Sequence, residues 1–472
     1  MTTFAQAAQM QETRTTNGMR ALSGSGKASV DLFYNIGAMR GKDPSVAFSQ
    51  AFAENTDLAV RIALWARDVR GGAGERELFR KILTWLESRD QEVALKVLAK
   101  IPEVGRWDDI FVFKTPALKD AAYRMLGDAL RAQNGLAAKW TPRKGPIAKE
   151  LREMFGMSPK FYRKSLVRLT NVVETQMCAK AWDEINFSHV PSVAAARYKK
   201  AFLRNAPEAY KGYVEKLAKG DTSVKINASA IFPHDVLREV LVHGQVNKVD
   251  DTRLKALTAQ WDALPNYVGD SAVLALVDVS GSMSCPVGGQ TGLTCHQVAL
   301  SLGLYVADKN RGPFKDTFLT FSSNPQLLHL KGNIVDKLRA MNGSNWNMST
   351  NVIAAFKKIL SVAKQHQVAD ADMPKTLLIM SDMQFNECAT YDRSAMETVE
   401  AEFAAAGYTA PNVVFWNLKA SGNTPVKSDK SGAALISGFS PAILTAVLSN
   451  SEEFTPYAIM LKAVMNDKYA WQ

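Results

Sequence analysis

Three short polar segments of the chain carry residues that suit a hard metal ion. The first is Asp278-Val279-Ser280-Gly281-Ser282, which directly follows the apolar run 272–277. This run is short and β-branched enough to be a buried strand, so Asp278 is expected at its carboxyl end, where open α/β sheets bind ligands. One carboxylate and two hydroxyls are oxygen ligands of the kind that Mg²⁺ prefers.

Two later segments add further oxygen ligands. The apolar run 375–380 ends in Ser381-Asp382, and Thr350 precedes an amphipathic stretch over 352–363. If the two runs are parallel strands of one sheet, their polar ends meet at the same edge. The predicted site binds Mg²⁺ or another divalent cation through Asp278, Ser280, Ser282, Thr350 and Asp382. The alternative is that these loop residues cap helices and bind no ion.

In this arrangement the chain resembles the von Willebrand A domain. In that family, residues matching these five form a metal-ion-dependent adhesion site (MIDAS) at the top edge of a Rossmann-like sheet. The residue after Thr350 is Asn351, where the family often has an aspartate. The resemblance implies a Rossmann-like domain with a MIDAS, at which an acidic protein ligand can complete the coordination of Mg²⁺.

The surrounding pattern alternates strands and helices, as such a domain requires. Apolar runs at 317–321, 377–380 and 413–416 predict further parallel strands. Helical patterns lie between them, at 294–309, 350–364 and 394–406. This alternation predicts a doubly wound sheet. A last helical pattern, 457–465, is expected to pack back on the helical half of the chain.

The N-terminal half is helical in pattern from about residue 30 to residue 219. Apolar spacing predicts helices near 58–65, 78–86 and 93–98, the last of them ended by Ile101-Pro102. Successive helices joined by tight turns predict a HEAT-like α-helical repeat module, preceded by an irregular lead-in over residues 1–30. The predicted fold class is therefore α + α/β, with a basic helical-repeat domain at 1–267 and an A-like domain at 268–472.

Positive charge is concentrated in the helical half. The chain has a net charge of +11, and residues 131–219 alone hold 18 Lys and Arg against 7 Asp and Glu. Such a concentration indicates a polyanion ligand, and the interleaved aromatic residues suit RNA. The alternative is that the cations form a solvated helix face while the aromatic rings are core. The RNA-binding candidates are Lys160, Arg163, Lys164, Arg168, Arg197, Lys199, Lys200 and Arg204.

Other classes of protein find little support. No run of about 18 apolar residues predicts a membrane span, and the N-terminus lacks the pattern of a secretory signal. The four cysteines include no Cys-x-x-Cys pair, which favours a reducing, cytoplasmic compartment. Cys285 and Cys295 both follow the first metal-binding motif and could pair, but two free thiols are the simpler interpretation. Phosphate-loop, nucleophile-elbow and zinc-protease motifs are absent, so we do not expect an enzyme.

Two segments of the helical half resemble Ro proteins. They are 61–79, with Asp68-Val69-Arg70-Gly71-Gly72-Ala73-Gly74-Glu75-Arg76, and 177–202. The segments 346–350 and 381–385 look most like those of uncharacterised bacterial and phage relatives. Ro proteins join a helical-repeat (TROVE-type) module to a von Willebrand A domain, in the order expected here.

The Ro resemblance implies a ring of helical repeats closed by the A domain. Small structured RNAs would bind its outer basic surface, and single-stranded 3′ ends would enter its central hole. The expected function is thus a non-enzymatic RNA-binding scaffold, a cytoplasmic ribonucleoprotein. The alternative is a metal-dependent protein-interaction module that acts beside an AAA+ ATPase or another assembly.

Overall fold

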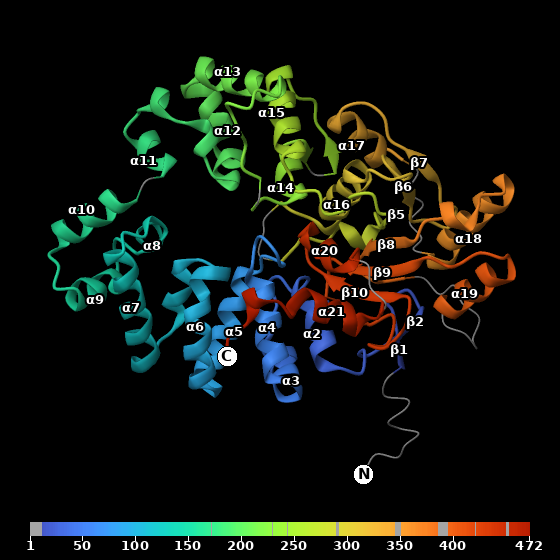
Figure 1. Ribbon diagram of the computed structural model, residues 1–472, viewed down its shortest axis with the longest axis horizontal. Helices are drawn as coiled ribbons and strands as arrows, with labels where there is room; N and C mark the ends of the chain where they lie inside the picture. The colour runs from blue at the N-terminus through green and yellow to red at the C-terminus, as the bar shows by residue number, and fades with distance from the viewer. Residues whose placement is uncertain are drawn as a thin grey trace, which may run out of the picture.

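In the computed structural model of the chain, an arc of helices meets a six-stranded sheet (Figure 1). The helices of the arc come from the N-terminal half and the sheet from the C-terminal half, which confirms the mixed α + α/β class. The structure describes residues 12–170, 172–228, 230–242, 244–288, 292–344, 351–385, 395–420, 422–449 and 453–472.

The helices of the arc follow one another with short connections, and most bury one apolar stripe. Their bounds are α2 (Ala28–Ile36), α3 (Ser45–Glu54), α4 (Thr56–Arg67), α5 (Arg76–Arg89), α6 (Gln91–Val104), α7 (Pro116–Arg131), α8 (Gly135–Trp140), α9 (Pro146–Met154), α10 (Pro159–Leu169), α11 (Val173–Cys178), α12 (Ser192–Asn205), α13 (Pro207–Ala218), α14 (Pro233–Leu237) and α15 (Asp251–Asp262).

The three helices expected from apolar spacing lie within α4, α5 and α6. The predicted end of the third was wrong, because α6 continues through Pro102 to Val104. Proline disrupts a helix chiefly by lacking an N–H donor and by crowding the preceding turn. Pro102 stands two residues from the end of α6, and the Gly105 N–H still donates to the Ile101 carbonyl at 2.8 Å.

The sheet has the strand order β10-β9-β8-β5-β6-β7, and every neighbouring pair is parallel except β6 with β7. Four strands match the predicted apolar runs, whereas the two edge strands β7 and β10 were not expected. The bounds are β5 (Val273–Val277), β6 (Thr317–Thr320), β7 (Leu327–His329), β8 (Thr376–Ser381), β9 (Asn412–Asn417) and β10 (Ala433–Ser437).

Helices cover both faces of the sheet. A Cβ on Gly303 of α16 would lie 2.3 Å from Cγ2 of Val277, so only glycine lets this helix approach β5 so closely. Leu274, on the opposite face of β5 because side chains alternate along a strand, lines a small apolar cavity with Ile359 of α18. The bounds in this part are α16 (Cys295–Lys309), α17 (Ile334–Asn342), α18 (Val352–His366), α19 (Ala395–Ala405), α20 (Leu444–Val447) and α21 (Pro456–Val464).

Within residues 12–30, the only part of the predicted, mostly irregular lead-in that the structure describes, a short hairpin and the start of α2 are regular, and the hairpin contacts the sheet region. A hairpin of β1 (Glu12–Arg14) and β2 (Arg20–Leu22) contacts the loop after β8, where the Thr15 hydroxyl donates to the Phe385 carbonyl. Helix α2 packs on β10, and its end comes so close that a Cβ on Gly37 would lie 2.7 Å from Gly438. As predicted, α21 returns to the helical half, since it contacts α4 and α2 as well as β10.

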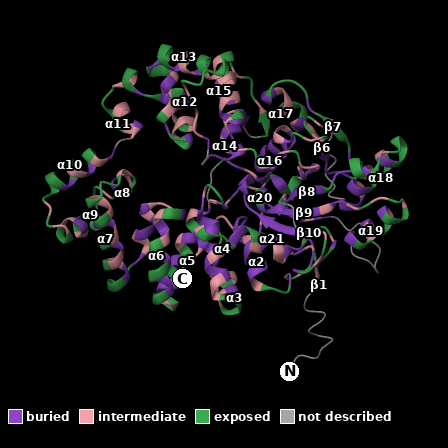
Figure 2. Cartoon of the chain, in the orientation of Figure 1, coloured by how far each residue is buried: buried purple, intermediate pink, exposed green. Residues whose placement is uncertain are grey.

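Burial divides the molecule into two cores. One continuous core runs from α2 and α4 through the sheet, while a second, smaller core lies beneath α11, α12 and α13. Figure 2 shows buried residues concentrated around the sheet and mostly exposed or half-buried residues over α9 and α10. The sheet region therefore contacts both ends of the arc, through α2 on β10 and through α14 on α16, whereas α9 and α10 bury few residues.

Candidate metal centre and nucleic-acid interface

Of the predicted metal ligands, Asp278 directly follows β5 and Asp382 directly follows the neighbouring strand β8, and Ser280 and Ser282 lie just after Asp278. These strands are parallel, and the Asp278 N–H donates to the Met380 carbonyl at 3.0 Å, so Asp278 and Ser381 stand together at the carboxyl edge. The Asp278 carboxylate accepts the Ser280 N–H at 2.9 Å and the Ser381 hydroxyl at 2.5 Å. The Ser280 and Ser282 hydroxyl oxygens lie 3.0 Å apart on the loop that follows Asp278.

Asp382, the next residue after β8, is fully buried and incompletely hydrogen-bonded. Its Oδ1 accepts the Gln384 N–H at 3.2 Å, whereas its Oδ2 finds no donor among the residues that the structure describes. A buried carboxylate oxygen without a partner costs free energy, which a bound cation would offset. The unpartnered oxygen therefore fits the predicted ion.

The pKa of Asp278 supports the same interpretation. Burial raises this pKa to about 6, although hydrogen bonds from Ser381 and Ser280 oppose the rise, and the nearby Asp382 adds to it. Two buried carboxylates beside hydroxyls form an all-oxygen set, which suits Mg²⁺ rather than zinc. Within the described ranges, no group of three or more His, Cys, Asp and Glu forms a metal cluster.

Thr350, the fifth predicted ligand, lies outside the described residues. Its neighbour Asn351 is the N-cap of α18, because its side chain accepts the Ala354 N–H at 2.9 Å. Asparagine and aspartate are both strong N-caps. Helix capping thus accounts for Asn351, at the position where von Willebrand A domains often carry an aspartate.

Of the eight RNA-binding candidates, seven are exposed, four of them on α10 and three on α12. Lys199 is the exception: it is buried, and its ammonium lies 2.9 Å from the Glu239 carboxylate. The aromatic residues are divided as well, since Tyr162 and Phe202 are core whereas Phe161 is 59% exposed. The exposed candidates are Lys160, Arg163, Lys164, Arg168, Arg197, Lys200 and Arg204.

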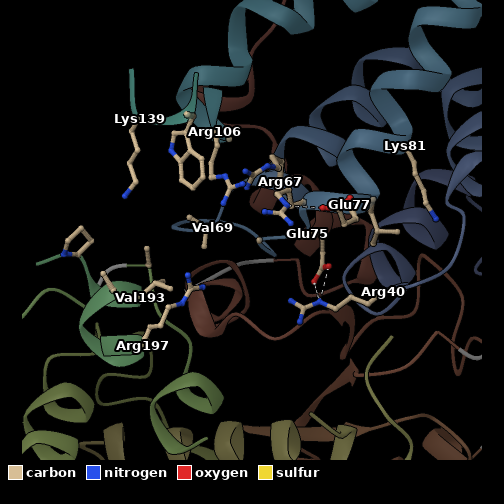
Figure 3. A pocket seen from close by; sticks show the side chains of 18 of the residues that line it. Arg40, Arg67, Val69, Glu75, Glu77, Lys81, Arg106, Lys139, Val193 and Arg197 are labelled. Atoms are coloured by element: carbon tan, nitrogen blue, oxygen red, sulfur yellow. Dashed lines mark hydrogen bonds and ion pairs between the residues drawn. The ribbon is translucent and has the colours of Figure 1, made fainter. Parts of the chain in front are cut away.

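A cavity of about 690 Å³ opens inside the arc, and we call it the central cavity (Figure 3). Its walls come from the α4–α5 turn, α8, α11 and α12, and they include Trp140 and Tyr198. Basic side chains outnumber the three acidic ones, Glu75, Glu77 and Glu174. The basic residues are Arg40, Lys42, Arg67, Arg76, Lys81, Arg106, Lys139 and Arg197.

Several of these cations are held by pairing. The Arg40 guanidinium lies 2.7 Å from the buried Glu75 carboxylate, and Arg67 lies 2.7 Å from Asp109. The Arg106 guanidinium stacks 3.7 Å from the centre of the Trp140 ring.

Two other cations, Lys42 and Lys81, donate to the backbone carbonyls of Ala420 and Lys42. For Lys139 and Arg197 no ion pair occurs within the described part of the chain, and the Lys139 ammonium lies 5.5 Å from the centre of the Trp140 ring.

Charge density along the sequence identified only Arg197 among these lining residues. The others come from segments far apart in the chain, which only the folded arc brings together. The sequence did single out one wall of the cavity, since the segment 68–76, which resembles Ro proteins, forms the α4–α5 turn. There Asp68 accepts the Lys468 ammonium at 2.5 Å and the Tyr469 hydroxyl at 3.0 Å, which ties this wall of the cavity to the C-terminal end.

The chain thus combines two features, a helical arc with a cation-lined cavity and a doubly wound sheet with two carboxylates at one edge. By sequence the chain belongs to the family of "Uncharacterized protein L728" from Acanthamoeba polyphaga mimivirus. The two are 31% identical over 513 residues, which cover 95% of this chain and 86% of the viral protein. Two family models also match, each described as a domain of unknown function: DUF2828 at residues 147–274 and DUF7788 at residues 272–468.

Among solved structures, the crystal structure of the Ro (RSR) protein of Deinococcus radiodurans aligns with 93% of this chain and 99% of its own. The TM-score is 0.46 and the sequence identity 14%. A likeness at this level assigns neither a fold nor a function. Across the described residues, every helix is too short or too polar to cross a lipid bilayer.

Proposed function

We propose that the chain is a non-enzymatic RNA-binding scaffold of the Ro type, acting in the cytoplasm, with the central cavity as a contact for single-stranded RNA. The observation that carries this proposal is the excess of basic side chains around the cavity, with Lys139 and Arg197 left without an ion pair among the described residues. Lys and Arg bind nucleic acid by neutralising phosphates and releasing counterions.

Aromatic rings beside these cations favour a single strand. Trp140 and Tyr198 both line the cavity, and unpaired bases stack on such rings with little sequence preference. Structured RNA is assigned to the outer surface, where α10 carries four exposed cations together with the exposed Phe161. This division also follows the sequence resemblance to Ro proteins in segments 61–79 and 177–202.

The decisive experiment measures binding of a fluorescent single-stranded RNA by anisotropy over a series of salt concentrations. Lys139→Glu combined with Arg197→Glu is expected to weaken binding at least tenfold. Loss of two phosphate contacts should also flatten the slope of log K against log salt by about 1.4. The matched control reverses the same charge on α7, with Arg124→Glu and Arg131→Glu, both of which are exposed and neither of which lines the central cavity. Equal weakening in both double variants would contradict a role for the cavity.

We further propose that the sheet edge binds Mg²⁺ through Asp278, Ser280, Ser282, Thr350 and Asp382. Bound there, the ion would supply a positive charge with an open coordination position for an acidic side chain of a protein partner. The unpartnered oxygen of Asp382 supports this site.

The same observation supports the alternative function, a metal-dependent protein-interaction module. RNA binding that persists unchanged in EDTA would favour the scaffold. A chain that binds no RNA in the anisotropy assay at low salt, yet binds Mg²⁺, would favour the interaction module.

A further inference from the structure

Two cysteine thiols meet beside the acidic edge of the sheet. Cys285 directly follows the short 3-10 helix η4 (Gly281–Ser284), and Cys295 is the first residue of α16. The Cys295 N–H donates to the Cys285 carbonyl at 3.2 Å, so the two segments run antiparallel and place the cysteines opposite each other. Their sulfur atoms lie 3.5 Å apart.

The next pairs along these two segments hold the cysteines in this register. Pro286 forms an isolated bridge with Thr294, and the Val287 N–H donates to the Leu293 carbonyl at 2.8 Å. Residues that face each other across antiparallel segments keep their Cβ atoms about 4.5–5.5 Å apart, against about 3.5–4.5 Å within a disulfide, so a small approach suffices. The contact between the two sulfurs is therefore fixed by backbone pairing and not by side-chain rotation alone.

The two thiols differ in exposure in a way that suits a two-step oxidation. Cys295 is only 2% exposed, and its sulfur also lies 3.6 Å from the Leu418 carbonyl, whereas Cys285 is only half-buried. A disulfide needs the sulfurs about 2.05 Å apart, so they must approach by about 1.5 Å. Cys295 is held by α16, so this movement falls on Cys285 and the short helix η4 that precedes it.

We propose that Cys285 and Cys295 form a redox modification site, at which a peroxide oxidises the two thiols to an intramolecular disulfide. The Cys285 thiolate attacks one oxygen of hydrogen peroxide and becomes a sulfenic acid, and the other oxygen leaves as water after taking up a proton. The Cys295 sulfur then attacks the Cys285 sulfur and forms the S–S bond, and the sulfenic hydroxyl leaves with the Cys295 proton as a second water. Two thiols and one peroxide thus give one disulfide and two waters.

This site rests on the geometry of the two thiols and requires neither RNA nor Mg²⁺ to bind. It agrees with a reducing compartment, in which the thiols stay free until an oxidant appears. Reduction by a cellular dithiol reverses the bond through thiol–disulfide exchange.

The test uses the full chain with Cys178→Ser and Cys388→Ser, so that only the two opposed thiols remain. No Lys or Arg lies between them, so both stay on one tryptic peptide. After peroxide treatment and alkylation, we expect loss of both alkylatable thiols, a peptide about 2 Da lighter, and full recovery with dithiothreitol. Two alkylated thiols after treatment, or a sulfinic acid at Cys285 with Cys295 still free, would overturn the proposal.

A second variant tests the order of the two steps. Cys295→Ser removes the buried thiol, so peroxide should leave a sulfenic acid at Cys285 that dimedone traps. Cys295→Ala serves the same purpose if the serine variant does not fold, as judged by circular dichroism. Dimedone labelling that is equally strong when Cys295 is present would count against Cys295 as the resolving thiol.

Discussion

Asp278 and Asp382 place two buried carboxylates at one edge of the sheet. Asp278 satisfies its oxygens with Ser280 and Ser381, while one oxygen of Asp382 is left without a donor in the described part of the structure. Charge of the same sign at both positions, away from water, destabilises the fold unless a cation or a proton is present.

Asp382→Asn is expected to abolish Mg²⁺ binding measured by calorimetry. In the absence of Mg²⁺ the variant should unfold at the same or a slightly higher temperature, because an amide removes a buried charge, an effect of about 1 kcal/mol. The matched control is Asp429→Asn, which changes an exposed carboxylate elsewhere in the same part of the chain. Unchanged Mg²⁺ affinity in Asp382→Asn would refute the metal site.

Mg²⁺ affinity is expected to fall as the pH is lowered through about 6. Burial raises the pKa of Asp278 to about 6, and the protonated carboxyl competes with the metal. Without Mg²⁺, lowering the pH is expected to raise the stability of the fold, whereas it lowers the affinity for Mg²⁺. A buried acid with a raised pKa is held more stably when protonated, so the melting temperature should rise from pH 7 to pH 5. Melting curves at both pH values, with and without Mg²⁺, measure both effects.

Sequence reasoning predicts residue types at strand ends better than it predicts exposure. Asp278 and Ser381-Asp382 were placed at one edge because each directly follows an apolar run, and the structure brings them together. Lys199 belonged to a basic cluster by sequence, yet it is buried against Glu239, 40 residues further along the chain. A distant partner of this kind leaves no local pattern.

At the scale of elements, the apolar runs that form central strands were predictable and the edges of the sheet were not. β5, β6, β8 and β9 are buried, so their sequences are nearly continuous apolar runs. β7 spans only three residues and is largely exposed, so it carries too little pattern to stand out. The hairpin of β1 and β2 is equally short and is held by contacts far away in sequence.

The approach of α16 to β5 gives a prediction about one glycine. Gly303→Ala is expected to destabilise the protein by about 1–3 kcal/mol in urea unfolding, because the added methyl would overlap Val277 and force α16 from the sheet. Gly212→Ala in α13 is the matched control. No atom lies within 4 Å of a Cβ there, so helix propensity should stabilise it by up to about 1 kcal/mol. Similar effects of the two substitutions would contradict the close packing of α16 on β5.

For the whole molecule, the two halves of the sequence are not two independent cores. The main core includes α2 and α4 as well as the sheet, and the Ser437 hydroxyl donates to the Phe33 carbonyl at 2.8 Å. The C-terminal end returns in the same way, with Lys468 and Tyr469 bound to Asp68. Composition and periodicity locate the change from helices to alternating strands and helices. They do not indicate that α2, near the N-terminus, packs on β10 of the C-terminal sheet.

This shared core determines how the chain can be divided. A fragment of residues 268–472 contains every strand of the main sheet but lacks α2, whose buried Phe33 and Tyr34 face that core. It also loses the bonds from Gly37 N–H to the Ser437 hydroxyl, at 3.0 Å, and from the Asn417 amide to the Tyr34 carbonyl, at 3.3 Å. We therefore expect this fragment to aggregate or to melt without a cooperative transition.

Joining residues 12–43 ahead of residue 268 through a flexible Gly-Ser linker should restore a cooperative melt and a dispersed NMR spectrum, because α2 can then cover β10. The matched control carries Phe33→Ser and Tyr34→Ser in the joined segment, which keeps the linker but removes the apolar side chains. It should behave like the shorter fragment. If residues 268–472 alone give the same spectrum and melting temperature as the joined fragment, α2 is dispensable and the boundary at 268 marks an independent folding unit.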